Sequence, residues 1–213
     1  MIIDKKLKLT IIGLLLGDAN IQVFQKSKDQ HRVSTQPTTA RLRIIHSEKQ
    51  YEYIQHKYEI LRPLIRQKKI LSYTETNKNG QIYVKYYFNT KTMPELAFFY
   101  HMFYKKDPKT NQIVKILPKL IHRFLTPITL AYWFMDDGSL KWKNRSKAVR
   151  ICTDSFTKSE VEYLTFLLNK QYNLQARTYK TRSRLRIYIP NRHNEWTNII
   201  QNFIHFSMAY KLP

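Results

Sequence analysis

One pattern occurs twice along this chain, and that repeat restricts the possible folds more than any other feature of the sequence. Residues 9–19 and 128–138 each form an apolar run of helical length that ends in an acid followed by a small residue. In both copies the run is followed by two short strands, a helix, two more strands and an aromatic helix. Because a repeat of this depth rarely arises by chance, it predicts two halves of similar structure.

Apolar periodicity and turn residues place these elements along the chain. In the first half we expect strands over 21–25 and 42–45, a helix over 51–61, strands over 70–74 and 82–89, and a helix over 95–104. In the second half we expect strands over 140–143 and 149–152, a helix over 161–170, strands over 174–179 and 185–189, and a helix over 195–206. The predicted fold class is therefore α+β, with two αββαββα halves, residues 1–104 and 125–213, joined by a polar connector over 105–124.

Local signals support several of these boundaries. Two segments have the spacing of a capping box, in which side chain and backbone satisfy each other's donors: Ser47 to Gln50 and Thr157 to Glu160. Thr126 and Pro127 are typical of the N-cap and the first position of a helix, so the second apolar helix is expected to begin there. Asn79-Gly80 favours a tight turn between the strands over 70–74 and 82–89.

Each apolar run carries one acid at its end, Asp18 in the first and Asp137 in the second. Helices this apolar must be buried on nearly all sides. Gly13 and Gly17, one turn apart, allow another helix to approach closely, and we expect that partner to be the matching helix of the other half. A single Asp after a helix is ordinarily a solvated cap. Two such acids together repel each other and oppose the helix dipoles, which favours a divalent cation between them.

At these residues the sequence resembles a known family. Residues 11–19 and 130–138 resemble the two copies of the LAGLIDADG motif of homing endonucleases. The second copy is similar to the version in the yeast mitochondrial intron-encoded branch, and so are the flanking residues 125–127 and 208–213. Two positions depart from the motif, because Ala19 replaces the final glycine of the first copy and Tyr132 replaces the glycine of the second. Tyr132 leaves open how tight and symmetric the contact of the two helices is.

The resemblance implies a monomeric, single-chain enzyme whose halves are related by a pseudo-twofold axis and packed through the two motif helices. Such an enzyme cuts both strands of a long asymmetric DNA site, leaves short 3′ overhangs and promotes intron mobility from an organelle genome, mitochondrial or chloroplast. The implied cofactor is Mg²⁺, for which Mn²⁺ substitutes. Its implied ligands are Asp18, Asp137 and the carbonyl oxygens of Gly17 and Asp136. Lys115 and Lys211 match the lysines that the branch places near each active site, which implies catalytic roles for them.

The charge of the chain agrees with a polyanionic partner. It has 37 Lys and Arg residues against 15 acids, a net charge of +22, and such an excess favours nucleic acid or an anionic membrane surface. A membrane is not expected, because the longest apolar run, residues 11–16, is far shorter than the roughly 20 residues of a span. The single cysteine, Cys152, excludes a disulfide framework and a Cys-rich zinc site.

Period-two alternation gives several of the predicted strands one apolar and one basic face. Two such sheets are expected to form a saddle along the DNA major groove, where Arg and Gln can read base edges. Ordinary solvent-facing strands are the alternative, and binding that weakens steeply with salt would favour DNA. The residues that we expect to contact DNA are Gln22, Gln25, Arg41, Arg43, Lys85, Tyr87, Lys141, Lys143, Arg150, Arg177, Lys180, Arg182, Arg184, Arg186 and Arg192.

Two other functions remain open at this point. The first is an intron maturase on the same fold, with intron RNA as its partner. The second is a catalytically silent DNA-binding regulator, which would bind DNA without Mg²⁺ and would tolerate Asp18→Asn. Intact acids at both predicted sites favour cleavage, because binding alone would not require them.

Overall fold

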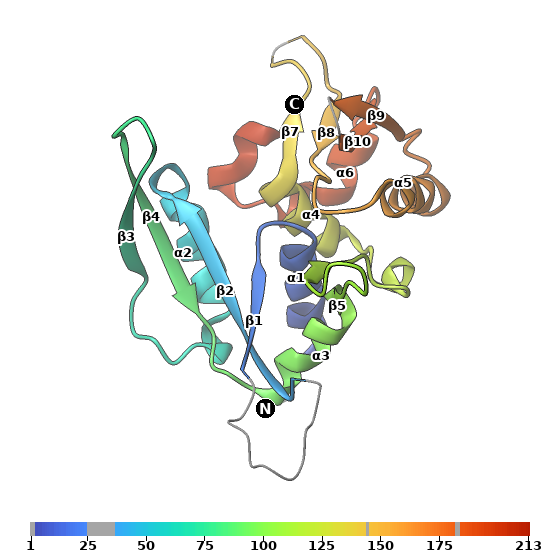
Figure 1. Ribbon diagram of the computed structural model, residues 1–213. Coiled ribbons are helices and arrows are strands. Elements are labelled where there is room, and N and C mark those ends of the chain that lie inside the picture. Colours follow the sequence, from blue (N-terminus) through green and yellow to red (C-terminus); the bar gives the residue numbers. More distant parts are fainter. Residues whose placement is uncertain (1–2, 25–36, 144, 182–183) are drawn as a thin grey trace. The chain divides into compact units, whose positions relative to one another are not determined.

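The computed structural model describes residues 3–24, 37–143, 145–181 and 184–213 (Figure 1). It divides into two compact units. Unit 1 comprises Met1–Leu7 and Asp18–His101, and unit 2 comprises Lys8–Gly17 and Met102–Pro213. The predicted α+β class is confirmed, because each unit combines helices with an antiparallel sheet. None of the helices among these residues is long and apolar enough to cross a membrane.

The described part of unit 1 contains a four-stranded sheet in the order β1-β2-β4-β3. Its strands are β1 (Asn20–Phe24), β2 (Thr39–Ser47), β3 (Leu71–Thr76) and β4 (Ile82–Asn89). The 3-10 helix η1 (Glu48–Gln50) leads into α2 (Tyr51–Ile60), which packs on β2 and β4 (Figure 1). Then come η2 (Arg62–Leu64), before β3, and α3 (Pro94–Phe103), after β4. Along β2 every second residue from Ala40 to His46 is buried, so one face of the sheet supplies the core.

The described part of unit 2 repeats this topology with the sheet order β7-β8-β10-β9. Its strands are β7 (Gly138–Leu140), β8 (Val149–Ile151), β9 (Arg177–Thr181) and β10 (Arg184–Ile189). α5 (Lys158–Tyr172) packs on β9 and β10, and α4 (Pro127–Asp137) contacts β7 and α6 (Glu195–Ile200) (Figure 1). The remaining elements are β5 (Tyr104–Lys106), β6 (Ile113–Lys115), η3 (Ile121–Arg123), η4 (Gln201–Phe203) and η5 (Phe206–Lys211). The shared strand order confirms the repeat that the sequence predicts.

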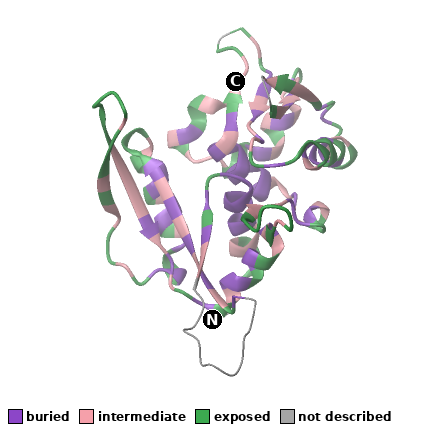
Figure 2. Ribbon diagram, viewed as in Figure 1, coloured by how far each residue is buried: buried purple, intermediate pink, exposed green. Residues whose placement is uncertain are grey.

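The two motif helices pack against each other within unit 2. α1 (Lys5–Leu16) is buried from Thr10 onward, and α4 is buried over residues 128–136 (Figure 2). The Thr129 hydroxyl donates a hydrogen bond to the Leu9 carbonyl oxygen at 3.1 Å, which links the helices directly. The predicted helix–helix contact is therefore confirmed, and residues 8–17 belong to unit 2.

The two predicted capping boxes have opposite outcomes. Thr157 and Glu160 form one at the start of α5, with both reciprocal bonds present. Ser47 makes no side-chain cap bond, so that prediction is wrong. The Gln50 side chain instead accepts a hydrogen bond from His46 Nδ1 at 2.8 Å. His46 lies on the buried face of β2, and its ring needs a hydrogen-bond partner, so Gln50 bonds to this ring and does not cap the helix.

Several elements differ in extent from the prediction, among them β2 and α6, and three differences have local reasons. β7 ends at Leu140 because the chain turns over the next residues, where the Trp142 carbonyl accepts from two later amides. β9 begins only at Arg177, because Gln175 has a positive φ of 50°, which extended strands do not adopt. Within the predicted connector, β5 and β6 pair as a hairpin whose turn places Asn111 at a φ of 58°.

Candidate active site

α1 and α4 approach each other closely at Gly13, within α1, and at Gly17, directly after it. A Cβ added to Gly13 would lie 2.6 Å from the Thr129 carbonyl oxygen and 2.9 Å from Tyr132 Cβ. A Cβ added to Gly17 would lie 2.5 Å from Asp136 Cβ. These distances are shorter than ordinary contacts between non-bonded atoms. The contact is therefore tight despite Tyr132, because the glycine that faces Tyr132 provides the space that the second helix lacks.

Lys115 and Lys211 reach the carboxyl ends of the two motif helices. Lys115 Nζ donates a hydrogen bond to the Gly17 carbonyl oxygen at 2.9 Å. Lys211 Nζ donates to the carbonyl oxygens of Met135 and Asp136 at 2.6 and 3.0 Å. The last carbonyls of a helix have no partner within the helix and lie at the negative end of its dipole. Unit 2 therefore places one ammonium group at the end of each motif helix.

The acids lie at or beside these helix ends. Asp137 is the last residue of α4, is half-buried, and accepts a hydrogen bond on its backbone oxygen from Cys152 N at 2.9 Å. Asp18, exposed, follows Gly17 directly in the chain and belongs to unit 1. Asp136 is buried beside Gly17. Burial, and secondarily the Asp136 charge, raises the pKa of Tyr132 well above its usual value, so this phenol stays neutral.

The donor atoms at the helix ends fit a hard divalent cation. The described residues contain no group of three or more His, Cys, Asp and Glu side chains that could hold a metal. A cation held by one carboxylate would therefore take its other ligands from main-chain carbonyls, water and phosphate oxygens, which is the ligand set that Mg²⁺ accepts. The carbonyls of Gly17 and Asp136 lie at the negative ends of the motif helices, and each accepts a hydrogen bond from an ammonium group.

One face of the unit 1 sheet gathers the residues predicted there. Paired residues of antiparallel strands share a face, and the register pairs Gln22 with Arg41 and Ile45 with Tyr87. By alternation Arg43 and Lys85 belong to the same face. The residues of β2 on this face are only partly buried, whereas those on the opposite face are buried (Figure 2).

Contacts between neighbouring side chains order this face. Arg41 Nε donates to Gln22 Oε1 at 2.8 Å. The Arg43 guanidinium lies 4.8 Å from the centre of the Tyr87 ring, and Lys85 forms an ion pair with Glu75. Five predicted residues are thus brought together, whereas Gln25 lies outside the described residues.

The unit 2 sheet gathers four of its predicted residues on one face. The register pairs Tyr188 with both Arg150 and Arg177, and Arg186 with Tyr179, and alternation adds Arg184. Lys180 pairs with Leu185 and so lies on the opposite face, away from these arginines. Its contact with DNA stays a prediction. Arg182 lies outside the described residues.

Asp154 is a residue that sequence reasoning missed. Its carboxylate accepts hydrogen bonds from Arg186 Nε at 3.0 Å and from Nη2 at 2.6 Å. The bound guanidinium lowers the pKa of Asp154, so this carboxyl is ionised at neutral pH. The bidentate contact fixes the Arg186 side chain on the basic face. The Asp154 and Arg186 positions are far apart in the chain, and no local pattern links them.

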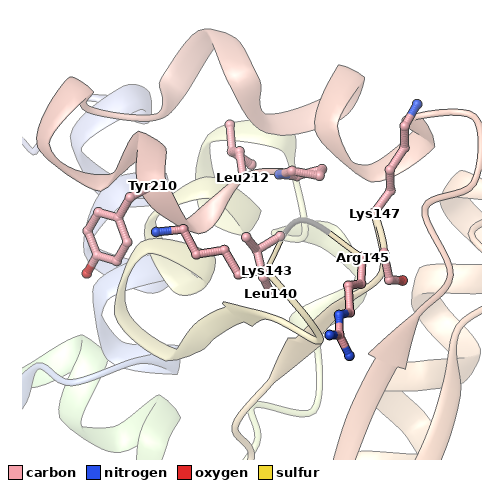
Figure 3. A pocket seen from close by; sticks show the side chains of 8 residues that line it. Leu140, Lys143, Arg145, Lys147, Tyr210 and Leu212 are labelled. Atoms are coloured by element: carbon pink, nitrogen blue, oxygen red, sulfur yellow. The ribbon is translucent and has the colours of Figure 1, made fainter.

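The remaining predicted basic residues lie in loops. Lys141 and Lys143 follow β7 in a bend and a turn, so the expected strand there is wrong, and exposed Arg192 precedes α6. Lys143 lines an open pocket of about 470 Å³ together with Arg145, Lys147 and Tyr210. Lys143 extends toward Tyr210, whereas Lys147 points away from it (Figure 3). Arg145 and Lys147 were missed, although the basic run over 141–147 signals them.

Comparison with known proteins gives a consistent family assignment. The LAGLIDADG DNA endonuclease family matches residues 9–196. The chain is 36% identical to the DNA endonuclease I-ChuI of Chlamydomonas applanata, over 100% of this chain and 96% of that protein. It is 32% identical to the cytochrome b mRNA maturase bI2 of Saccharomyces cerevisiae, over 65% of this chain and 33% of that protein. The solved structure of the homing endonuclease I-WcaI bound to its DNA recognition sequence has the same fold, with a TM-score of 0.80 and 24% identity, and the match covers 100% of this chain and 88% of that one.

Proposed function

This chain belongs to the LAGLIDADG DNA endonuclease family, and on that basis we propose that it is a site-specific homing endonuclease. It hydrolyses one phosphodiester in each strand of a long asymmetric DNA site and promotes the mobility of an organelle intron. The products carry 5′ phosphates and 3′ hydroxyls on short 3′ overhangs. The single observation that carries the proposal is the pair of ammonium groups, Lys115 and Lys211, held at the ends of the two motif helices.

We propose that the end of each motif helix is the cleavage centre for one of the two DNA strands. Asp18 and Asp137, with the carbonyls of Gly17 and Asp136, would hold Mg²⁺ or Mn²⁺, and these donors are the kind that hard cations prefer. The bound cation supplies Lewis-acid stabilisation of phosphate charge. Both acids follow carbonyls that already face a lysine, which supports their placement at these centres.

We propose that the two lysines stabilise negative charge on the scissile phosphates. In phosphodiester hydrolysis negative charge builds up on the phosphate oxygens, and a fixed ammonium group stabilises it because the group needs no reorganisation during the reaction. Lys115 comes from the end of β6 and Lys211 from the end of η5, and both are part-buried at their carbonyl contacts. Each side chain is thus ordered before substrate arrives.

The basic faces of the two sheets are proposed to bind the duplex. Arg41, Arg43 and Gln22 on one sheet, and Arg150 and Arg186 on the other, stand on strand faces opposite the buried ones. β-ribbons fit the major groove, and Arg and Gln side chains can make bidentate contacts with base edges there. A saddle built from the two sheets remains the predicted binding mode.

Cleavage-site selection from a randomised duplex library tests the proposal. With Mg²⁺ we expect one long sequence to be enriched among the cut products, and with EDTA in place of Mg²⁺ we expect no cutting. Sequencing of the cut ends would show the 3′ overhang. Binding to the library duplexes with no cut products in any divalent cation would contradict the endonuclease and leave a DNA-binding regulator.

Each active-site lysine makes a separate prediction. We expect Lys115→Met and Lys211→Met each to slow single-turnover cleavage by about 100-fold, because each removes one charge beside a scissile phosphate. The dissociation constant for the target should change little. Lys119→Met, an exposed lysine in the segment that follows Lys115, is the matched control and should cut at the wild-type rate. Equal loss in all three variants would point to a nonspecific effect of charge.

RNA splicing is a second candidate, because a cytochrome b mRNA maturase is among the relatives. The basic sheet faces would then contact intron RNA through phosphates and 2′-hydroxyls. Splicing of a precursor RNA by purified protein, compared with cleavage of the intronless DNA, separates the two functions. Asp137→Asn discriminates further, since it should stop cleavage and leave splicing intact.

A further inference from the structure

We infer that Glu160, at the start of α5, is a positioning residue for Lys115, an inference that rests on the proposed role of this lysine. Glu160 uses both carboxylate oxygens. Oε2 accepts hydrogen bonds from the backbone N and the hydroxyl of Thr157, both at 2.8 Å, which completes the capping box. Oε1 accepts from the backbone N of Leu117 at 2.8 Å, and Leu117 lies two residues beyond Lys115. The helix cap alone needs only Oε2.

The chain that carries Lys115 is held from two sides. On one side Tyr104 pairs with Lys115 in the β5–β6 ladder, and Ile116 N donates to the Phe103 carbonyl at 2.7 Å. On the other side the contact from Glu160 fixes Leu117, which is buried with 7% of its surface exposed. The ladder ends at Lys115, so the Glu160 bond continues the support beyond the last strand residue.

The segment before α5 also touches the Lys115 side chain. Lys115 Nζ lies 5.7 Å from the centre of the Phe156 ring, whose negative face attracts an ammonium group. Phe156 is buried and precedes the capping box directly. One short segment, residues 156–160, therefore contacts both the backbone and the side chain of the Lys115 segment. A movement of this segment would carry Nζ away from the Gly17 carbonyl.

The chemistry of Glu160 explains why a carboxylate is needed. Its two oxygens accept three hydrogen bonds, two from backbone N–H groups and one from a hydroxyl. Glutamine offers one oxygen and an NH₂ group, so Glu160→Gln leaves either Leu117 N or the Thr157 donors facing another donor. Glu160→Asp keeps the charge and can still cap the helix, but its shorter side chain does not span to Leu117. Thr157→Val removes the hydroxyl from the cap and leaves the Leu117 bond intact.

The test compares single-turnover cleavage of the selected duplex by these variants. We expect Glu160→Gln and Glu160→Asp to slow cleavage by about 10-fold to 100-fold, since small misplacements of a catalytic group cost that much. Thr157→Val should cut within about twofold of wild type, even if it lowers the melting temperature as much as the Glu160 variants do. In a Lys115→Met background, Glu160→Gln should cause no further loss, because contacts that act through one residue are not additive.

A second readout does not use cleavage. Reductive methylation of the folded protein without DNA, followed by mass spectrometry, measures how readily the Lys115 ammonium reacts. We expect faster methylation of Lys115 in Glu160→Gln than in wild type or Thr157→Val. Unchanged labelling, or a Glu160→Gln penalty that is the same with and without Lys115, would overturn the positioning role. A wild-type chain that never cuts DNA refutes the endonuclease instead, and the labelling still decides whether Glu160 positions Lys115.

Discussion

Asp137→Asn is expected to lower the rate of double-strand cleavage by about 1,000-fold, and Asp18→Asn is expected to do the same. The amide keeps the size and shape of the carboxylate and removes the negative charge that holds a divalent cation. Binding should persist, because the DNA contacts are assigned to the basic sheet faces. The measurement is single-turnover cleavage with Mg²⁺ on the selected duplex, together with a dissociation constant determined in Ca²⁺ or EDTA.

Net charge is the main confounding factor in that experiment. Each Asp→Asn change removes one negative charge and so raises the net charge of +22 by one, and this alone strengthens nonspecific DNA binding. Asp107→Asn, in the β5–β6 hairpin turn, makes the same change of charge away from the helix ends. It should cut normally. Near-normal cutting by Asp137→Asn or Asp18→Asn would refute the assigned metal ligands.

Gly13→Ala is expected to lower the free energy of unfolding by about 2 kcal/mol. Alanine in the middle of a helix would by itself gain about 1 kcal/mol over glycine. The new methyl group would lie 2.6 Å from the Thr129 carbonyl oxygen, a main-chain atom that moves only if α4 moves. Overpacking costs of about 1–3 kcal/mol, and more against backbone, therefore exceed the gain in helix propensity. Chemical denaturation measures the difference.

Gly80→Asn is the matched control for that substitution. Gly80 has a φ of 77° and nothing within 4 Å of an added Cβ, so its requirement is conformational and not steric. Asparagine tolerates this left-handed conformation, and we expect a change near zero. A Gly13→Ala protein as stable as the wild type would mean that α1 and α4 do not pack as closely as described.

Much of the fold could be predicted because its signals are local. The Thr157 capping box, Pro127 at the start of α4 and the strand over 82–89 were each predicted from a few adjacent residues, and the structure confirms them. The repeat predicted that both sheets would have the same strand order. One error arose where a capping preference met a competing hydrogen bond. Gln50 accepts a hydrogen bond from the buried ring of His46 and therefore does not form the predicted capping box.

The candidate site divides in a similar way. The motif residues and the two lysines were found by resemblance, but sequence reasoning could not show that each lysine donates to a carbonyl at the end of a motif helix. Lys180 was predicted to contact DNA together with Arg177, but the two are three residues apart on β9, and alternation places side chains at odd separations on opposite faces.

The sequence by itself determined the repeat, the two buried helices with their terminal acids, and the basic charge of the chain. These follow from composition and periodicity, which act over a few residues. Only the tertiary structure decided that Gly13 makes room for Tyr132, that Asp154 holds Arg186, and that Glu160 reaches Leu117. Each of these contacts joins residues more than 30 positions apart, and such pairs are selected by the packing of whole elements and not by local preference.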